Sequence, residues 1–181
     1  MLGGVAIGLS TRGTEAPQSR EVSFDAALAA FGTASNYYLK IPGIPGDSTS
    51  STHANEIDVE TFSWGLTNTT GTAAITNLTV SKYIDPASPL LMKATALGTT
   101  FTSIVLTADK TGSTPFRYVT LTLSNAKLKS FKETGSRATG ILENITFSYT
   151  QARLRYTSQS STGGIGPSVE ACFDFPSRTV C

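Results

Sequence analysis

The sequence has few of the residues that most reactive or ligand-binding sites need. Its 181 residues include one histidine, two cysteines and one tryptophan, and only 15% are charged. The net charge is +1 and the Lys and Arg residues are scattered, so the clustered positive charge that neutralises phosphates is missing. We therefore expect no nucleic-acid partner. One histidine and two cysteines are also too small a set for a zinc site, and we expect no metal or cofactor.

Long apolar runs are missing as well. No stretch approaches the ~20 apolar residues of a membrane-spanning helix, so we expect no membrane insertion. The first residues, MLGGVAIGLS, have a short apolar run. However, they lack the positive charge that begins a signal peptide, and the best small-residue cleavage site runs into Pro17. We predict that residues 1–36 are a retained N-terminal extension with one short helix, which Ser23 begins and Gly32 ends.

Thr, Ser and Gly are abundant between short apolar runs, a composition typical of strands and tight turns. The length and the 39% hydrophobic content suffice for one sizeable core. Within IDVETFSWGL, Ile57 and Val59 lie on one face of a predicted strand, whereas Phe62 lies on the other. This change of phase requires a bulge or bend near Glu60, and a second one is expected near Thr150. Such bends curl sheets into barrels, so we predict an all-β fold.

One segment departs from the strand pattern. In DPASPLLMKATALG, Ser88 is predicted as the N-cap of a helix, Pro89 as its first residue and Gly98 as its left-handed stop. We expect one helix of about two and a half turns among the strands. Its predicted apolar face consists of Leu90, Leu91, Ala94 and Leu97.

A polar loop rich in Gly and Ser lies between the first two predicted strands and contains the only histidine. Residues 46–48, Gly-Asp-Ser, resemble the nucleophile segment of GDS-type esterases, whose serine needs a histidine base. Here the only candidate is His53, five residues from the serine, and the alternating β-α pattern of that fold is missing. Asp47, His53, Glu56 and Asp58 are potential metal ligands without the spacing of an EF-hand. We favour a solvated polar loop in which His53 hydrogen-bonds backbone or a neighbouring chain.

The two cysteines, Cys172 and Cys181, lie in the last ten residues. A disulfide that closes the C-terminal loop and a pair of free thiols fit this spacing equally well. A disulfide would imply an oxidising environment at some stage. Trp64 shares a face with Phe62 and Leu66, so we interpret it as a core residue rather than a platform for sugar stacking.

The segment YYLKIPGIPGDSTSSTHANEIDVETFSWG combines a predicted strand, a Gly-Asp-Ser loop with its histidine, Glu-Ile-x-Val and Ser-Trp-Gly. This combination resembles the first signature of the Hcp family, the haemolysin-coregulated proteins that form the inner tube of type VI secretion systems. LTVSKYIDPASPLLMKATALG resembles the family's strand end and single helix, while FRYVTLTLSNAKLKSF and ENITFSYTQARLRY resemble its closing strands. The resemblance covers residues 37–156 in the family's order.

The resemblance implies a compact barrel of two antiparallel sheets with one helix on its side, in a domain of residues 37–156. Residues 157–181 are expected to be a C-terminal tail. The implied function is that of a non-enzymatic structural subunit, whose copies form six-membered rings that stack into a hollow tube. Secreted effectors and tube-tip or sheath proteins are the implied partners. The protein is then expected to be secreted, or cytoplasmic before export. The alternative is a secreted β-rich protein of the same fold that forms free extracellular filaments or acts as an adhesive or binding module.

Stacked rings need a projecting polar loop that complements the next ring, and the loop with the histidine is the best candidate. Its predicted interface residues are Gly46, Asp47, Ser48, Thr49, Ser50, Ser51, Thr52, His53, Asn55 and Glu56. Three features depart from the family: the extension of residues 1–36, the short GLTNTTGTAA in place of a long Gly-rich loop, and the Cys-containing tail GIGPSVEACFDFPSRTVC. We hypothesise that the extension lies across a neighbouring subunit or ring, with a flexible tail as the alternative.

Overall fold

The computed structural model describes residues 35–69, 71–112, 115–160 and 163–181. They belong to one structural unit, Thr33–Cys181. The helix predicted between Ser23 and Gly32 lies outside the described residues, as does almost all of the predicted extension.

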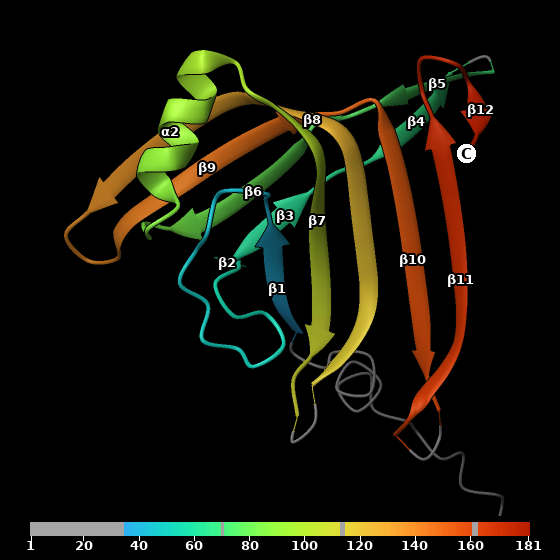
Figure 1. Ribbon diagram of the computed structural model, residues 1–181, viewed down its shortest axis with the longest axis horizontal. Helices are drawn as coiled ribbons and strands as arrows, with labels where there is room; N and C mark the ends of the chain where they lie inside the picture. Colours follow the sequence, from blue (N-terminus) through green and yellow to red (C-terminus); the bar gives the residue numbers. More distant parts are fainter. Residues whose placement is uncertain (1–34, 70, 113–114, 161–162) are drawn as a thin grey trace, which may run out of the picture. The chain divides into compact units, whose positions relative to one another are not determined.

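The described residues form strands and one helix, and this confirms the predicted all-β class (Figure 1). One sheet has the order β12-β11-β10-β8-β7-β1-β2, and it continues from β8 through β9 and β6 to β3. All of these pairs are antiparallel, and β4 and β5 form a separate hairpin. The elements are β1 (Ser35–Lys40), β2 (Ile57–Val59), β3 (Thr61–Ser63), β4 (Leu66–Thr69), β5 (Thr72–Ile75), β6 (Leu78–Tyr83), α2 (Ser88–Leu97), β7 (Thr100–Lys110), β8 (Phe116–Ser136), β9 (Gly140–Ser148), β10 (Gln151–Gln159), β11 (Ile165–Asp174) and β12 (Thr179–Val180).

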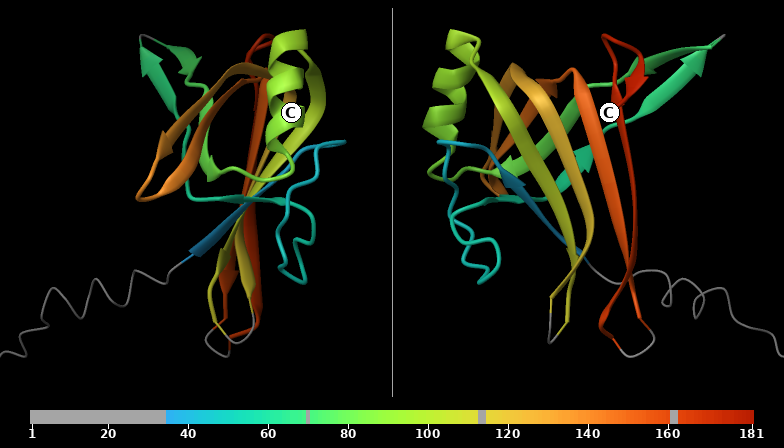
Figure 2. Two further views of the ribbon diagram at one scale, coloured as in Figure 1. Left: turned by 90° about the vertical axis from the view of Figure 1, so that its left-hand side faces the viewer. Right: turned by 45° about the vertical axis from the view of Figure 1, so that its right-hand side comes forward.

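Strand β8 belongs to both layers of the barrel. In its first half, Thr122 lies opposite Val105 of β7 on one side and Arg153 of β10 on the other. In its second half, Phe131 lies opposite Ile145 of β9. The register shifts between the two halves, and such an irregularity bends a strand. Figure 2 shows this bend, from which β8 and β9 run together as the second layer.

The bend predicted near Glu60 is where the chain passes from one layer to the other. Strand β2 pairs with β1, whereas β3, which is separated from β2 by the single residue Glu60, pairs with β6. The backbone N–H of Glu60 donates to the carbonyl of Ser81 at 2.8 Å, so the joint is tied to the second layer. Ile57 and Val59 are buried on one side of this joint, as their phase predicted.

The phase change predicted near Thr150 is also present. Ile145, Phe147 and Tyr149 are buried, and the next buried residue is Ala152. The buried positions therefore change from odd to even residue numbers after Tyr149. Farther along β10, Leu154 is 37% and Tyr156 48% exposed, so the buried face does not continue beyond Ala152.

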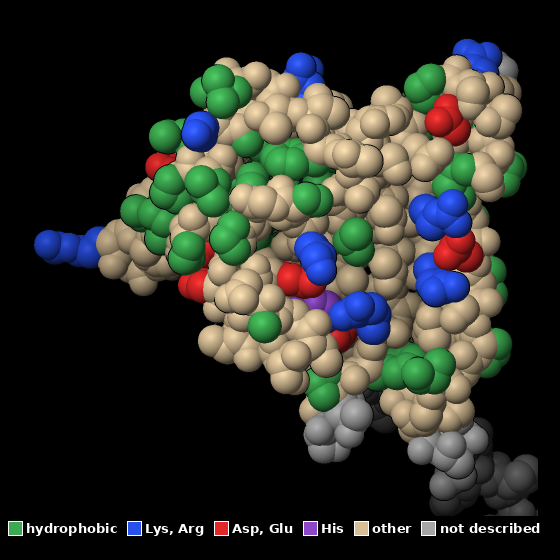
Figure 3. Space-filling model, in the orientation of Figure 1, with side chains coloured by type: hydrophobic (Ala, Val, Ile, Leu, Met, Phe, Trp, Pro, Cys, Tyr) green, Lys and Arg blue, Asp and Glu red, His purple; other side chains and the backbone are tan. Residues whose placement is uncertain are grey.

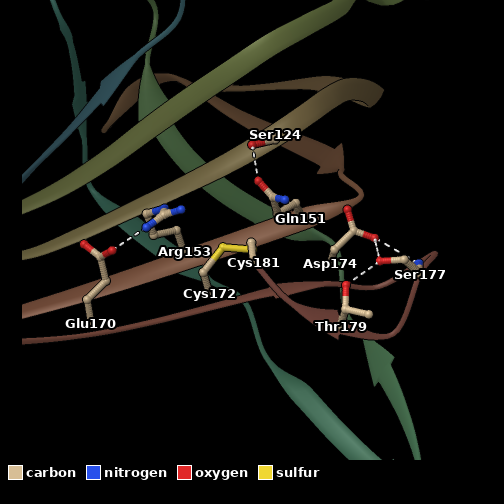
Figure 4. Close-up of a disulfide and its surroundings, with 9 residues drawn as sticks. All are labelled: Ser124, Gln151, Arg153, Glu170, Cys172, Asp174, Ser177, Thr179 and Cys181. Atoms are coloured by element: carbon tan, nitrogen blue, oxygen red, sulfur yellow. Dashed lines mark hydrogen bonds and ion pairs between the residues drawn. A yellow bond between two sulfur atoms is a disulfide. The ribbon is translucent and has the colours of Figure 1, made fainter.

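Residues predicted as a C-terminal tail extend the sheet instead. Strand β11 pairs with β10 from Gln151 opposite Asp174 to Gln159 opposite Ile165, and the short β12 pairs with the end of β11. Cys172 and Cys181 form a disulfide with a Cα–Cα distance of 5.3 Å, which decides between the two alternatives left open by their spacing (Figure 4). The disulfide therefore fastens the last residue of the chain to the edge of the sheet.

The predicted helix is α2, and it ends at the predicted residue, since Gly98 adopts a φ of 62°. Its beginning differs: the N-cap is Ala87, and the carboxylate of Asp85 accepts the N–H of Ala87 at 2.8 Å. Ser88 is instead buried inside the first turn. The predicted apolar face is only partly correct, because Leu91 and Ala94 are buried whereas Leu90 is 39% and Leu97 71% exposed.

Candidate functional site

The loop that contains the histidine folds back on itself between β1 and β2. The N–H groups of Gly46 and Ser48 donate to the carbonyls of Asn55 and Glu56 at 2.9 and 3.1 Å. The N–H of Asn55 donates to the carbonyl of Ser48 at 3.0 Å. A Cβ atom on Gly46 would lie 2.5 Å from the carbonyl oxygen of Glu56, so this close approach of two backbones requires glycine. The loop is therefore ordered by its own backbone.

The predicted interface residues divide into two groups. Gly46, Ser48 and His53 are buried within the chain itself, while Ser50 and Glu56 are half-buried. The others form an outer face of small polar side chains, which consists of Asp47, Thr49, Ser51, Thr52 and Asn55. Only this second group has the exposure that a contact with another molecule needs.

His53 is 1% exposed and lies between two carboxylates. Its Nδ1 is 2.7 Å from Oε2 of Glu56, and its Nε2 is 2.9 Å from Oδ2 of Asp109 on β7. The ring of Tyr38 stacks on the imidazole with a centroid distance of 3.8 Å. Figure 3 shows the histidine in a depression between acidic and basic side chains. The prediction that His53 would bond backbone or a neighbouring chain was wrong about its partners, which are carboxylates of its own chain.

This geometry does not support the esterase or the metal interpretation. Both ring nitrogens of His53 face carboxylates, and the hydroxyl oxygen of Ser48 instead accepts the N–H of Ser50 at 3.4 Å. Across the described ranges, no group of three or more His, Cys, Asp or Glu residues is arranged to hold a metal ion. The loop is held by its own hydrogen bonds and presents polar side chains on its outer face.

A second polar cluster, which the sequence did not reveal, joins α2 to the barrel. Lys82 and Glu143 are both 0% exposed, and Nζ of Lys82 lies 2.6 Å from Oε2 of Glu143. The same ammonium lies 2.8 Å from Oδ1 of Asp85 and donates to the hydroxyl of Ser88 at 3.1 Å. One signal was available, since Glu143 lies on an otherwise apolar face of β9, and a buried acid requires a cation.

An apolar groove of about 430 Å³ lies between the β4 side of the barrel and the C-terminal strands. Glu170 is the single charged residue at its rim. The predicted core residue Trp64 is half-buried, packs against the core and also lines this groove. Figure 4 shows the disulfide beside this groove, between Cys172 on β11 and Cys181, the residue after β12. The groove is lined by Trp64, Leu66, Ala152, Leu154, Ala171, Cys172, Phe173, Phe175 and Val180.

Comparison with known proteins identifies the family. Residues 38–156 match the family described as "Type VI secretion system effector, Hcp". The chain belongs to the Hcp family. It is 31% identical over 138 residues to protein hcp1 of Pseudomonas aeruginosa, an alignment that spans 70% of this chain and 85% of that protein.

Solved Hcp structures have the same fold. Hcp1 from Salmonella typhimurium is 29% identical with a TM-score of 0.74, and the match covers 82% of this chain and 99% of that one. A structure titled "Structure of a type six secretion system protein" has a TM-score of 0.77 at 23% identity, with 82% and 100% covered. These matches confirm the predicted Hcp-like barrel. The part of the chain that the structure describes contains no helix that is long and apolar enough to cross a membrane.

Proposed function

We propose that this Hcp protein is a non-enzymatic structural subunit that assembles into rings, which stack into a hollow tube and carry or accompany secreted effectors. The observation that carries this proposal is the loop of residues 46–56. Its inner side chains are buried and bonded, and its outer face is polar and preorganised, so a partner can bind it at little cost in conformational entropy. Such a surface suits repeated contact between copies, not turnover of a substrate.

The edge of the sheet supports the same proposal. Strand β12 pairs only with Phe173 and Asp174, so within the described residues the outer edge of β11 from Ile165 to Cys172 has no strand beside it. An open edge with exposed apolar side chains promotes aggregation unless another chain covers it. Ile165 is 82% and Val169 73% exposed. Closed ring symmetry covers such surfaces by pairing each subunit with the next.

The first test is electron microscopy of the purified protein, together with its mass in solution by light scattering. We expect rings and, at high concentration, tubes. A chain that remains monomeric at high concentration would contradict the proposal. Ser51→Arg places a long cation on the outer face of the loop and is expected to prevent stacking of rings while the fold is retained. Thr134→Arg adds the same group to an exposed residue of β8, and we expect it to leave stacking unchanged.

The disulfide supports the second candidate, a secreted protein that forms free extracellular filaments or acts as an adhesive or binding module. Disulfides persist in oxidising compartments, so Cys172–Cys181 favours a stage outside the cytoplasm. The two candidates differ in their partners. Purification from native cells is expected to recover sheath, tube-tip or effector proteins with a secretion-system tube, and none of these with free filaments.

A further inference from the structure

The exposed large hydrophobic side chains of the described residues fall into two groups. The first group, the α2 surface, lies on and beside α2 and consists of Tyr83, Ile84, Leu90, Met92, Leu97 and Ile141. The second group, the groove surface, lies on β4 and the C-terminal strands and consists of Leu66, Leu154, Tyr156, Ile165, Val169 and Val180. Figures 1 and 2 show α2 on one side of the barrel and these strands on the opposite side. The chain therefore presents two apolar surfaces that face away from each other.

The α2 surface is unusual for a helix on the outside of a domain. The helix reads SPLLMKATAL, and Lys93 is its only charged residue. Leu91 is buried against the chain's own barrel, yet the outer residues Leu90, Met92 and Leu97 are also apolar and are 39%, 57% and 71% exposed. A surface helix normally has charged or polar residues on its outer face, and a helix that is apolar all round is normally buried. The composition of α2 is thus typical of a helix with protein on both sides.

The groove surface continues the core face of the main sheet. Directly opposite residues of an antiparallel pair share a face, and Leu154 of β10 lies opposite the buried Leu121 of β8 and opposite Ala171 of β11. Two residues farther along β10, Tyr156 lies opposite Val169. Leu154, Tyr156 and Val169 are nevertheless 37%, 48% and 73% exposed. An apolar sheet face needs another layer of structure to cover it, and here the chain's own second layer does not provide one.

The two surfaces suit each other in shape and in charge. One is a projecting helix, and the other contains the hollow of about 430 Å³ beside Trp64. Glu170, the charged residue at the rim of the hollow, is already paired with Arg153 and Arg155. The long stem of Lys93 lets its ammonium reach solvent at the edge of a contact. Contact between the surfaces therefore buries apolar side chains without leaving a charge unpaired.

The position of the two surfaces decides which copies meet. A pair of α2 helices from two copies would cover the α2 surface and leave the groove surface open. A head-to-tail contact, in which α2 of one copy meets the groove surface of the next, covers both surfaces on every copy once the ring closes.

We propose that α2 of one copy packs, through Leu90, Met92 and Leu97, on the groove surface of the next copy, and that this contact joins the subunits side by side. The proposal rests on the proposed function and names the residues through which a ring closes. The loop of residues 46–56 belongs to neither surface, so it stays available for stacking.

Two variants each disable one surface. Leu97→Glu places a charge on the α2 surface and Val169→Glu places one on the groove surface; these residues are 71% and 73% exposed, so the fold should be retained, as checked by circular dichroism. Each variant alone is expected to self-associate at least about tenfold more weakly than the native protein in sedimentation velocity. Thr134→Glu adds the same charge to an exposed residue of β8 outside both surfaces and is expected to assemble like the native protein.

A mixture of the two variants tests the head-to-tail arrangement itself. The Leu97→Glu chain keeps its groove surface and the Val169→Glu chain keeps its α2 surface, so one contact can form between them and a second cannot. We expect a 1:1 heterodimer at high concentration that does not grow further. If both variants assemble like the native protein, the inference is wrong and the proposed function stands. Assembly that is lost in Leu97→Glu but kept in Val169→Glu would also overturn the inference, because α2 would then pair with another surface.

The native protein in the same experiment reports on the proposed function. Native rings, together with the heterodimer in the mixture, support both proposals. Native open filaments with the same heterodimer support the contact and contradict the closed ring. A native chain that remains monomeric at high concentration overturns both.

Discussion

Replacement of Lys82 by Met tests the buried cluster that joins α2 to the barrel. Methionine has a similar length and no charge, so the substitution removes one cation and creates little empty space. Glu143, which is fully buried, and the nearly buried Asp85 then lose the ammonium that lies 2.6 and 2.8 Å from them. The expected result is a large loss of stability, because an unpaired carboxylate remains in the core.

The magnitude follows from the burial of both partners. Removal of one partner of a buried pair costs about 3–5 kcal/mol. For a chain of this size that corresponds to a fall in Tm of roughly 6–20 °C. Oε1 of Glu143 has no hydrogen-bond partner within the described residues, so the pair is incompletely satisfied even in the native protein. The double variant Lys82→Met with Glu143→Leu should therefore recover most of the loss.

The assay is equilibrium unfolding in urea, with calorimetry for Tm. Lys132→Met is the matched control, since Lys132 is exposed on β8, and it should change stability by about 0.5 kcal/mol or less. A loss below about 1 kcal/mol for Lys82→Met would refute the reasoning. So would a double variant that is no more stable than the single one.

Three further outcomes are expected. Gly46→Ala should lower the free energy of unfolding, measured in urea, by about 1–3 kcal/mol, because the added Cβ would meet the backbone carbonyl of Glu56. Gly112→Ala is the control and should be tolerated, because Gly112 has open space around it. Replacement of Cys172 and Cys181 by serine should cost about 2–3 kcal/mol by loop entropy, and dithiothreitol should destabilise the native protein but not this variant. Burial raises the pKa of the Tyr149 hydroxyl above its ordinary value of 10.0. The contribution of the neutral side chain to the free energy of unfolding is therefore complete below pH 10 and is lost as the pH rises through the raised pKa. Tyr149→Phe, which cannot ionise, should not show this loss in urea unfolding at different pH values.

Local features of the fold could be predicted from the sequence because they depend on neighbouring residues. The bend at Glu60 follows from a change of alternation within a few residues, and the helix stop at Gly98 from the need for positive φ. The exposure of Leu90 and Leu97 could not be predicted in this way. Which stripe of a helix is buried depends on the width of the surface beneath it, and the strand on which α2 mainly packs is β8.

The site was only half predictable for the same reason. The glycine- and serine-rich loop was recognised from its composition, and Glu56 lies three residues from His53. Asp109, the second partner, is 56 residues away along the chain, and only the pairing of β1 with β7 brings it to the ring. Lys82 and Glu143 are 61 residues apart and meet through the β6–β9 register in the same way.

The continuity of β8 has a mechanical consequence. One unbroken strand of 21 residues is hydrogen-bonded to β7 and β10 at one end and to β9 at the other. A force applied to one layer is therefore transmitted through the covalent backbone of β8 to the other layer, and one layer cannot separate from the other on its own. A subunit that travels through a narrow conduit under force would resist shear as a single body and yield, if at all, in one step.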